Sequence, residues 1–147
     1  RGGSVVTYVR FGDEVLSPVI DEGEADYIVS FELLEAARWL PYLKKGEGRI
    51  VTNTQEIDPM PVITGAMAYP ENLVEKMIGA GAAVDAIDCV SLADEAGNIK
   101  AVNLVLLGRL SRYFEIPEEA WHEAIRACVP KKFLEVNLKA FELGRAS

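Results

Sequence analysis

Apolar residues in the first hundred positions gather in short runs that predict strands separated by helices. Residues 25–31 are almost continuously apolar, which predicts a strand buried on both faces of a parallel sheet. Residues 49–53 and 82–91 predict two further strands. Residues 32–43 repeat apolar positions at helical spacing, and Pro41 is expected to kink or end that helix. This strand–helix–strand order is typical of a βαβ unit with a right-handed crossover.

Turn residues shape the rest of this half of the chain. Residues 4–17 predict a β-hairpin whose tight turn is centred on Gly12. Residues 54–69 contain two prolines and a glycine, so we predict an irregular segment, with a short edge strand at 62–64. A helix is expected from about residue 69 to 79, and a turn at 93–97.

The last third of the chain has helical periodicity throughout. Residues 102–114 are strongly apolar, and a second helix is predicted to begin at Pro117, whose fixed φ suits the first helical position. A third helix over residues 131–143 is expected to be capped by Gly144. We therefore predict one domain over residues 1–147, with an α/β body (1–100) and a C-terminal three-helix extension (101–147).

Composition narrows the classes of partner. The chain has 147 residues and a formal net charge of −8, so phosphate backbones would be repelled and a nucleic-acid partner is not expected. No apolar run approaches the roughly 20 residues that a membrane-spanning helix needs, so no membrane partner is expected either.

The few possible metal ligands are scattered. The chain has two cysteines, Cys89 and Cys128, and one histidine, His122. A zinc or iron–sulfur site needs three or four such ligands, so we expect this chain to hold no metal by itself. Cys89 is predicted in an apolar strand and Cys128 on the apolar face of a helix. Both are interpreted as buried, reduced thiols, as in a cytoplasmic protein.

No pair of side chains forms a convincing catalytic set, so no catalytic residue is assigned. His122 falls off the apolar stripe of its helix and is expected to face solvent without a positioned partner. Glu32 and Glu35 lie three apart and could share a helix face, although a solvated helix end explains them equally well. Asp85 and Asp88 are weak candidates near the carboxyl end of a strand, where α/β sheets place ligands.

Two asparagines and two tryptophans can each be interpreted either as structural residues or as contacts to another protein. Asn103 and Asn137 lie within apolar helices, where a buried amide either pins helices together or contacts another subunit. Trp39 and Trp121 are expected in the core, with an exposed docking patch as the alternative.

Taken in order, several segments resemble one known family. Residues 1–46 resemble the core of the gamma-type domain of 2-oxoacid:ferredoxin (acceptor) oxidoreductases. Residues 97–110 and 116–144 are similar to the C-terminal half of the small subunit of the indolepyruvate type. The element Asn-x-x-x-Leu-Gly at Asn103 and Val-Asn-Leu-Lys-Ala-Phe at 136–141 are the most specific parts of this resemblance, which covers the whole chain.

The resemblance implies a fold and an enzyme. The fold would be a Rossmann-like three-layer sheet, whose first strand and Gly-rich turn precede residue 1 in family members and are therefore expected to be missing here. The enzyme would decarboxylate a 2-oxoacid oxidatively, form an acyl-coenzyme A and pass electrons to ferredoxin. Thiamine diphosphate, Mg and iron–sulfur clusters would belong to a large (alpha) partner subunit, with coenzyme A as co-substrate.

The same resemblance suggests where this chain meets its partner. Arg1, Gly2, Gly3 and Arg10 follow the family's Gly-rich half, so we expect them near the large subunit or the cleft that faces coenzyme A. Asn103 is a further candidate for that contact. Two alternatives stay open: a free-standing nucleotide- or coenzyme A-binding module, and a scaffold domain that forms a homodimer.

Overall fold

Three short parallel strands form the centre of the molecule. The computed structural model describes residues 5–147. The strands are β1 (Tyr27–Ser30), β2 (Arg49–Asn53) and β3 (Ala83–Ile87), in the order β1-β2-β3. Tyr27 lies opposite Arg49, which in turn lies opposite Ala83. The predicted parallel sheet is confirmed.

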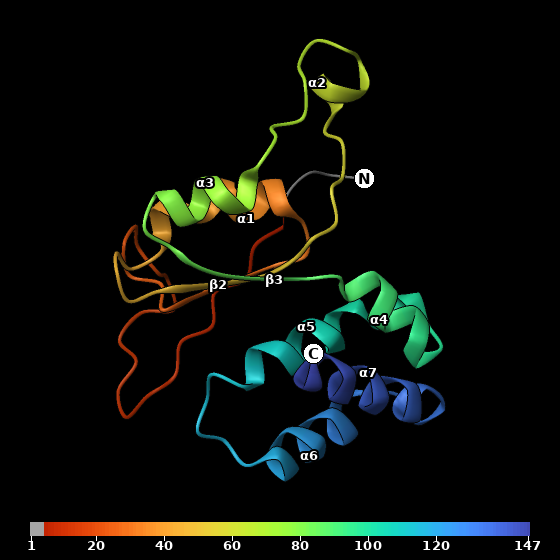
Figure 1. Cartoon of the computed structure of the whole chain (residues 1–147). Helices are drawn as coiled ribbons and strands as arrows, with labels where there is room; N and C mark the ends of the chain where they lie inside the picture. Colours follow the sequence, from red (N-terminus) through yellow and green to blue (C-terminus); the bar gives the residue numbers. More distant parts are fainter. Residues whose placement is uncertain (1–4) are drawn as a thin grey trace.

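Helices cover both faces of this sheet (Figure 1). On one face lie α1 (Leu33–Trp39), which continues into a 3₁₀ turn (Leu40–Tyr42) around Pro41, and α3 (Leu73–Gly79). Side chains alternate along β2, so Ile50 packs in a core with Ala36 and Met77 on this face, whereas Val51 points to the other face. The predicted three-layer α/β architecture is therefore confirmed.

The opposite face carries the C-terminal helices. They are α4 (Cys89–Ala96), α5 (Val102–Ser111), α6 (Glu118–Cys128) and α7 (Leu134–Ala146), with 3₁₀ turns at Ile99–Ala101 and Lys131–Phe133. Val51, Cys89 and Phe141 share one buried cluster, which joins the sheet to α4 and α7. The three predicted C-terminal helices are thus present and packed on the body. No helix within residues 5–147 is both long and apolar enough to cross a bilayer.

Helices α5 and α7 approach each other so closely that only glycine fits at the contact. A Cβ added at Gly108 would lie 2.0 Å from the carbonyl oxygen of Phe141, and one added at Gly144 would lie 1.9 Å from that of Val105. The predicted cap at Gly144 is therefore wrong. Gly144 lies inside α7, which runs to Ala146, and its missing side chain admits the α5 backbone.

The predicted β-hairpin is also wrong. Residues 5–18 form an irregular loop with no strand, held partly by the Arg10 guanidinium, which donates to the carbonyl oxygen of Val19 at 2.7 Å. A two-stranded hairpin is marginal unless a core supports one face. Here Val5, Phe11 and Leu16 are largely exposed, so most apolar side chains of this segment are not covered by the described part of the chain.

Helices take the place of strand at two further positions. The edge strand expected at 62–64 is instead part of a short helix, α2 (Met60–Ile63). The strand expected over 82–91 ends at Ile87, because Asp88 caps α4 by accepting a hydrogen bond from the Ser91 amide at 3.0 Å. The turn expected at 93–97 is likewise mostly helix, and only Gly97, with φ of +106°, ends it.

Candidate functional site

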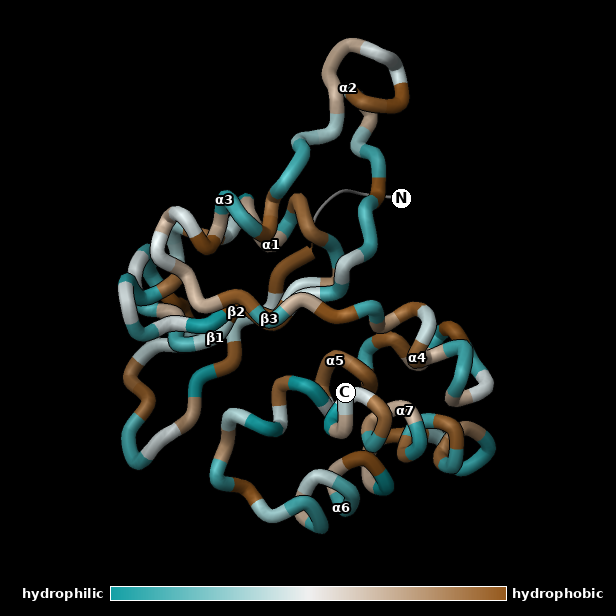
Figure 2. The backbone as a smooth tube through the Cα atoms, in the orientation of Figure 1, coloured by the Kyte–Doolittle hydropathy of each residue, from teal (hydrophilic) through white to brown (hydrophobic). Residues whose placement is uncertain are grey.

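A long connection between β2 and α3 projects from the carboxyl edge of the sheet (Figure 1). We call residues 54–72 the arm; α2 lies at its tip. The arm closes on itself, because the Thr64 amide donates to the Met60 carbonyl at 2.9 Å and the Met67 amide to the Pro61 carbonyl at 3.0 Å. Its tip is largely apolar in the hydropathy view (Figure 2). The arm is therefore an ordered projection.

A buried carboxylate, Glu32, holds the root of the arm. Glu32 lies two residues after the end of β1 and caps α1 by accepting from the Glu35 amide at 2.8 Å. The same carboxylate accepts from the Ile57 amide at 3.2 Å and from the Tyr69 hydroxyl. Burial, and then the hydrogen bond to this carboxylate, raise the pKa of Tyr69. Glu32 thus ties both ends of the arm to the sheet.

Removing this carboxylate should loosen the arm without unfolding the body. We expect Glu32→Ala to cost about 2 kcal/mol of unfolding free energy, because the amides of Glu35 and Ile57 and the Tyr69 hydroxyl lose their acceptor. Hydrogen exchange should accelerate at the Ile57 amide and stay slow at Ile50 in β2. Unchanged exchange at Ile57 would show that the arm is held by other contacts.

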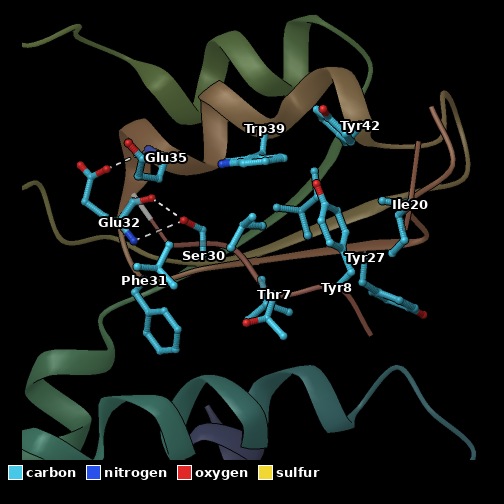
Figure 3. Close-up of a pocket in the computed structure, with 15 residues that line it drawn as sticks. Thr7, Tyr8, Ile20, Tyr27, Ser30, Phe31, Glu32, Glu35, Trp39 and Tyr42 are labelled. Carbon is cyan, nitrogen blue, oxygen red and sulfur yellow. Dashed lines mark hydrogen bonds between the residues drawn. The ribbon is translucent and has the colours of Figure 1, made fainter. Parts of the chain in front are cut away.

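A groove of about 560 Å³ runs along the outer side of β1 (Figure 3). Its walls are residues of β1, the face of α1 that carries Trp39, and the loop residues Val5–Tyr8. The rings of Tyr8 and Trp39 meet edge to face at 6.5 Å, and Trp39 contacts Tyr42 at 4.8 Å. Trp39 therefore lies half-buried in the groove wall, in contrast to the core position expected for it.

The strand beside this groove has a free edge. Among the described strands, β1 pairs only with β2, so the backbone groups on its other side have no strand partner. Val29 and Phe31 are exposed beside it. An uncovered strand edge with apolar neighbours favours association with another polypeptide.

Asn53 joins the three strands where they end. Its side-chain amide donates to the Phe31 carbonyl at 3.2 Å and to Gln55 Oε1 at 3.4 Å, while its Oδ1 accepts from the Cys89 amide at 3.0 Å. Asn53 is fully buried. This carboxyl-end polar residue escaped the sequence analysis; the only signal was an asparagine that closes a β-branched strand.

Asp85 anchors α5 to the opposite side of the sheet. Its carboxylate accepts from Arg109 Nε at 2.7 Å and from the Tyr113 hydroxyl, and the Arg49 guanidinium stacks 4.4 Å above the Tyr113 ring. Burial alone would raise the pKa of Asp85, but the hydrogen bonds from Arg109 and Tyr113 outweigh it and lower that pKa. The cluster joins β3 to α5, so Asp85 has a structural role.

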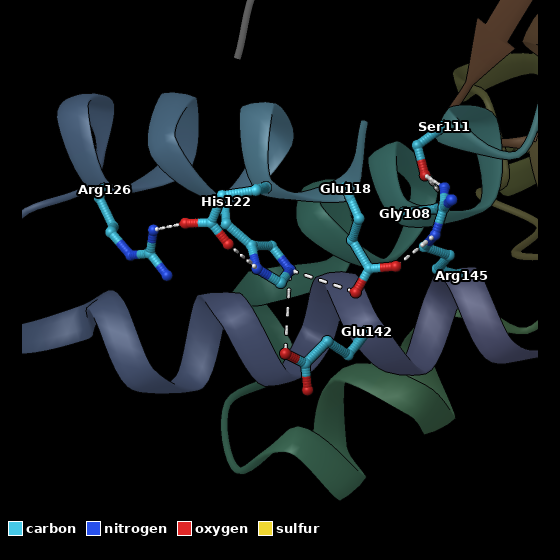
Figure 4. Close-up of polar contacts among 8 residues, drawn as sticks. Gly108, Ser111, Glu118, His122, Arg126, Glu142 and Arg145 are labelled. Atoms are coloured by element: carbon cyan, nitrogen blue, oxygen red, sulfur yellow. Dashed lines mark hydrogen bonds and ion pairs between the residues drawn. The ribbon is translucent and has the colours of Figure 1, made fainter. Parts of the chain in front are cut away.

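His122 is not the solvent-facing residue that was expected (Figure 4). Only 13% of its side chain is exposed, because α7 packs across α6 and the imidazole meets the Phe141 ring at 5.6 Å. Its Nε2 lies 3.9 Å from carboxylates of Glu118 and Glu142, and its Nδ1 lies 3.8 Å from Glu119. The apolar positions of α6 in the sequence did not predict that α7 covers His122. Trp121, on the neighbouring position, contacts Phe141 at 6.2 Å and packs against the core, as expected.

The two cysteines have different environments. Cys89 is buried, and burial raises the pKa of its thiol to about 12. Cys128 is exposed at the end of α6, so the prediction that it is buried is wrong; the following Pro130 ends the helix before another element covers it. Within residues 5–147, no three His, Cys, Asp or Glu side chains lie together as a metal site requires.

The two predicted contact residues that the structure describes, Arg10 and Asn103, do not lie together. Arg1, Gly2 and Gly3 lie outside the described residues. Arg10 lies in the N-terminal loop, 3.9 Å from Glu24, whereas Asn103 is exposed on α5 in a separate groove of about 260 Å³ that also includes Asn137. Asn137 is half-buried and donates to the Phe133 carbonyl at 2.7 Å, so it does not pin two helices together.

Comparison with known proteins places these features in context. All 147 residues match the family described as pyruvate ferredoxin/flavodoxin oxidoreductase. The indolepyruvate oxidoreductase subunit IorB of Thermococcus kodakarensis is 46% identical over 98% of this chain and 73% of its own length. The protein of the same name from Archaeoglobus fulgidus is 36% identical, again over 98% of this chain and 73% of the relative.

A solved structure shares the fold. The gamma subunit of a keto/oxoacid ferredoxin oxidoreductase from Geobacter sulfurreducens superposes with a TM-score of 0.60. The match covers 87% of this chain and 66% of that one, at 22% sequence identity. The chain therefore spans about two thirds of that structure and nearly three quarters of the curated relatives.

Proposed function

Because the chain belongs to the pyruvate ferredoxin/flavodoxin oxidoreductase family, we propose that it is the small subunit of a 2-oxoacid:ferredoxin oxidoreductase of the indolepyruvate type. In the proposed reaction the 2-oxoacid loses carbon dioxide and its carbonyl carbon forms a thioester with coenzyme A. The two electrons released pass to ferredoxin. The relatives named as indolepyruvate oxidoreductase subunits support the aryl substrate class.

The observation that carries the proposal is the family match over all 147 residues, and the apolar groove beside β1 gives it a surface. The edge of β1 beside exposed Val29 and Phe31 has no strand partner within residues 5–147, and such an edge can pair with another polypeptide or with chain that precedes residue 1. The groove is lined by aromatic side chains, which are enriched at such interfaces. We propose that the large subunit covers this groove.

The chemistry is assigned to that large subunit. Cys89 is buried at the start of α4 and Cys128 is exposed at the end of α6, so the described residues do not fit an iron–sulfur cluster. We therefore propose that thiamine diphosphate, Mg and the clusters are held by the partner, with coenzyme A and ferredoxin meeting the complex. Arg10 and Asn103 stay proposed as contacts to the partner or to coenzyme A.

Co-expression tests this proposal. We expect the protein to co-purify with the large subunit encoded nearest to it, and the complex to reduce a viologen dye anaerobically when indolepyruvate and coenzyme A are present. The separate chains should show about 100-fold less activity, because an incomplete assembly misplaces the reacting groups. A chain that stays alone and adds nothing to the large subunit would instead support the binding-module or scaffold alternative.

A further inference from the structure

We propose that the arm is a plug that enters an apolar recess with a basic rim on the large subunit. This inference rests on the proposed function and names a second, distinct element of the same interface. It concerns residues 54–72, which the sequence analysis assigned no role.

The arm exposes large apolar side chains far from its own core. Ile57, Met60, Ile63 and Met67 are 57%, 66%, 64% and 65% exposed. Figures 1 and 2 show the tip projecting from the carboxyl edge of the sheet and coloured as largely hydrophobic. Between Pro59 and Pro70 only Thr64 and Tyr69 carry polar side-chain groups. A projection of this composition would be unfavourable in water unless another surface covers it.

The arm is also ordered before any partner arrives. Glu32 fixes its two ends through Ile57 and Tyr69, and the Leu33 amide donates to the Gln55 carbonyl at 3.1 Å. Prolines at three positions restrict its backbone further. A preorganised apolar projection loses little conformational entropy on binding, which is the requirement for a plug that enters a recess.

Charge indicates the kind of recess. Every charged side chain in the arm is acidic: Glu56, Asp58 and Glu71. They lie at its base, below the apolar tip, so a matching recess would be apolar inside and carry Lys or Arg at its mouth. The same acidic base argues against insertion into an anionic lipid surface, which attracts basic segments.

The arm is continuous with the surface already assigned to the large subunit. Glu32, which holds the arm, is also part of the wall of the groove beside β1 (Figure 3). One partner could therefore cover the groove and receive the arm together. A second copy of this chain carries a net charge of −8, which disfavours it as the partner of the acidic base of the arm.

Aspartate substitutions at the tip test the plug. We expect Met60→Asp and Ile63→Asp each to weaken binding to the large subunit by about 30-fold or more, because each places a charge in an apolar recess. The matched control is Ile99→Asp, at a position 55% exposed on the other side of the sheet, which should change the affinity by less than about threefold. All three variants should keep the wild-type melting temperature, since none of these side chains is buried.

Two further measurements locate the contact and its charge. In a Cys128→Ser background, a cysteine introduced by Ala66→Cys should react with maleimide about tenfold more slowly once the complex forms. Cys89 is buried and should not react with the maleimide. The double reversal Glu56→Lys and Asp58→Lys should weaken binding by about tenfold, whereas Glu123→Lys on α6 should have little effect.

The outcomes separate this inference from the proposed function. If the wild type binds the large subunit and the tip variants bind within threefold of it, the plug is refuted and the subunit assignment stands. If the tip variants instead disrupt a homodimer and leave partner binding intact, the plug is also refuted. A wild type that does not bind the large subunit overturns both proposals.

Discussion

Replacing Gly108 or Gly144 by alanine should unfold the C-terminal helices. The added Cβ would lie 2.0 Å or 1.9 Å from a backbone carbonyl oxygen of the facing helix, a contact that no rotamer change relieves. Overpacking of a core commonly costs 1–3 kcal/mol, and a clash between two backbones exceeds that range because the helices themselves must separate. We expect a loss of about 4 kcal/mol, measured by urea unfolding followed by circular dichroism.

Gly79→Ala is the matched control. Gly79 ends α3, and a Cβ added there would meet nothing within 4 Å. Alanine at this position should leave the stability unchanged or raise it by up to about 1 kcal/mol, because it restricts the unfolded chain. Wild-type stability in Gly108→Ala or Gly144→Ala would mean that α5 and α7 do not pack at this distance.

Removing the guanidinium of Arg109 should cost nearly as much. Arg109→Leu leaves Asp85, which is 9% exposed, with the Tyr113 hydroxyl as its remaining partner. Breaking one side of a buried pair typically costs 3–5 kcal/mol, and we expect about 3 kcal/mol at pH 7. Arg38→Leu, which breaks the exposed pair with Glu35, should cost less than about 0.5 kcal/mol.

The same cluster gives a pH dependence with a defined sign. Burial opposes the ionised form of Asp85, but its hydrogen-bond donors prevail and its pKa in the folded protein is lowered. Its contribution is therefore fully present above the unfolded pKa of about 3.9 and is lost as the pH falls through the folded pKa. The difference in unfolding free energy between wild type and Arg109→Leu should therefore shrink as the pH falls below about 4. A difference that is constant with pH would exclude Asp85 as its origin.

Local patterns identified most of the body correctly. The run Arg-Ile-Val-Thr-Asn forms β2 as predicted, and Pro117 directly precedes the first residue of α6. In both cases residues that are adjacent in sequence determine the outcome: β-branched residues on a strand, and a proline whose ring suits a helix start.

Contacts between distant segments were the part that the sequence could not reveal. Gly144 looks like a helix cap in isolation, and only the position of α5 shows why glycine is required there. Glu32 was interpreted together with Glu35. Its carboxylate also accepts hydrogen bonds from Ile57 and Tyr69, which lie more than twenty residues later in the chain. The prediction of the N-terminal hairpin was wrong because a hairpin needs an apolar surface along one face, and most apolar side chains of this segment are exposed in the described chain.

The candidate site illustrates the same limit. The family resemblance is confirmed, yet the residues chosen from it, Arg10 and Asn103, lie in two separate grooves. The aromatic wall of the groove beside β1 combines Tyr8 with Trp39 and Tyr42, from two separate stretches of chain. No periodicity within one stretch predicts that Tyr8 meets the other two.

The free edge of β1 has a consequence for producing this stretch of chain by itself. Copies limited to these 147 residues and made in excess of the large subunit would carry an unpaired strand beside exposed Val29 and Phe31, which is a template for edge-to-edge aggregation. Such surplus copies should consequently be insoluble, while copies captured at once stay in solution. The yield of complex from these residues would then depend on the relative rates at which the two subunits are made as much as on their affinity.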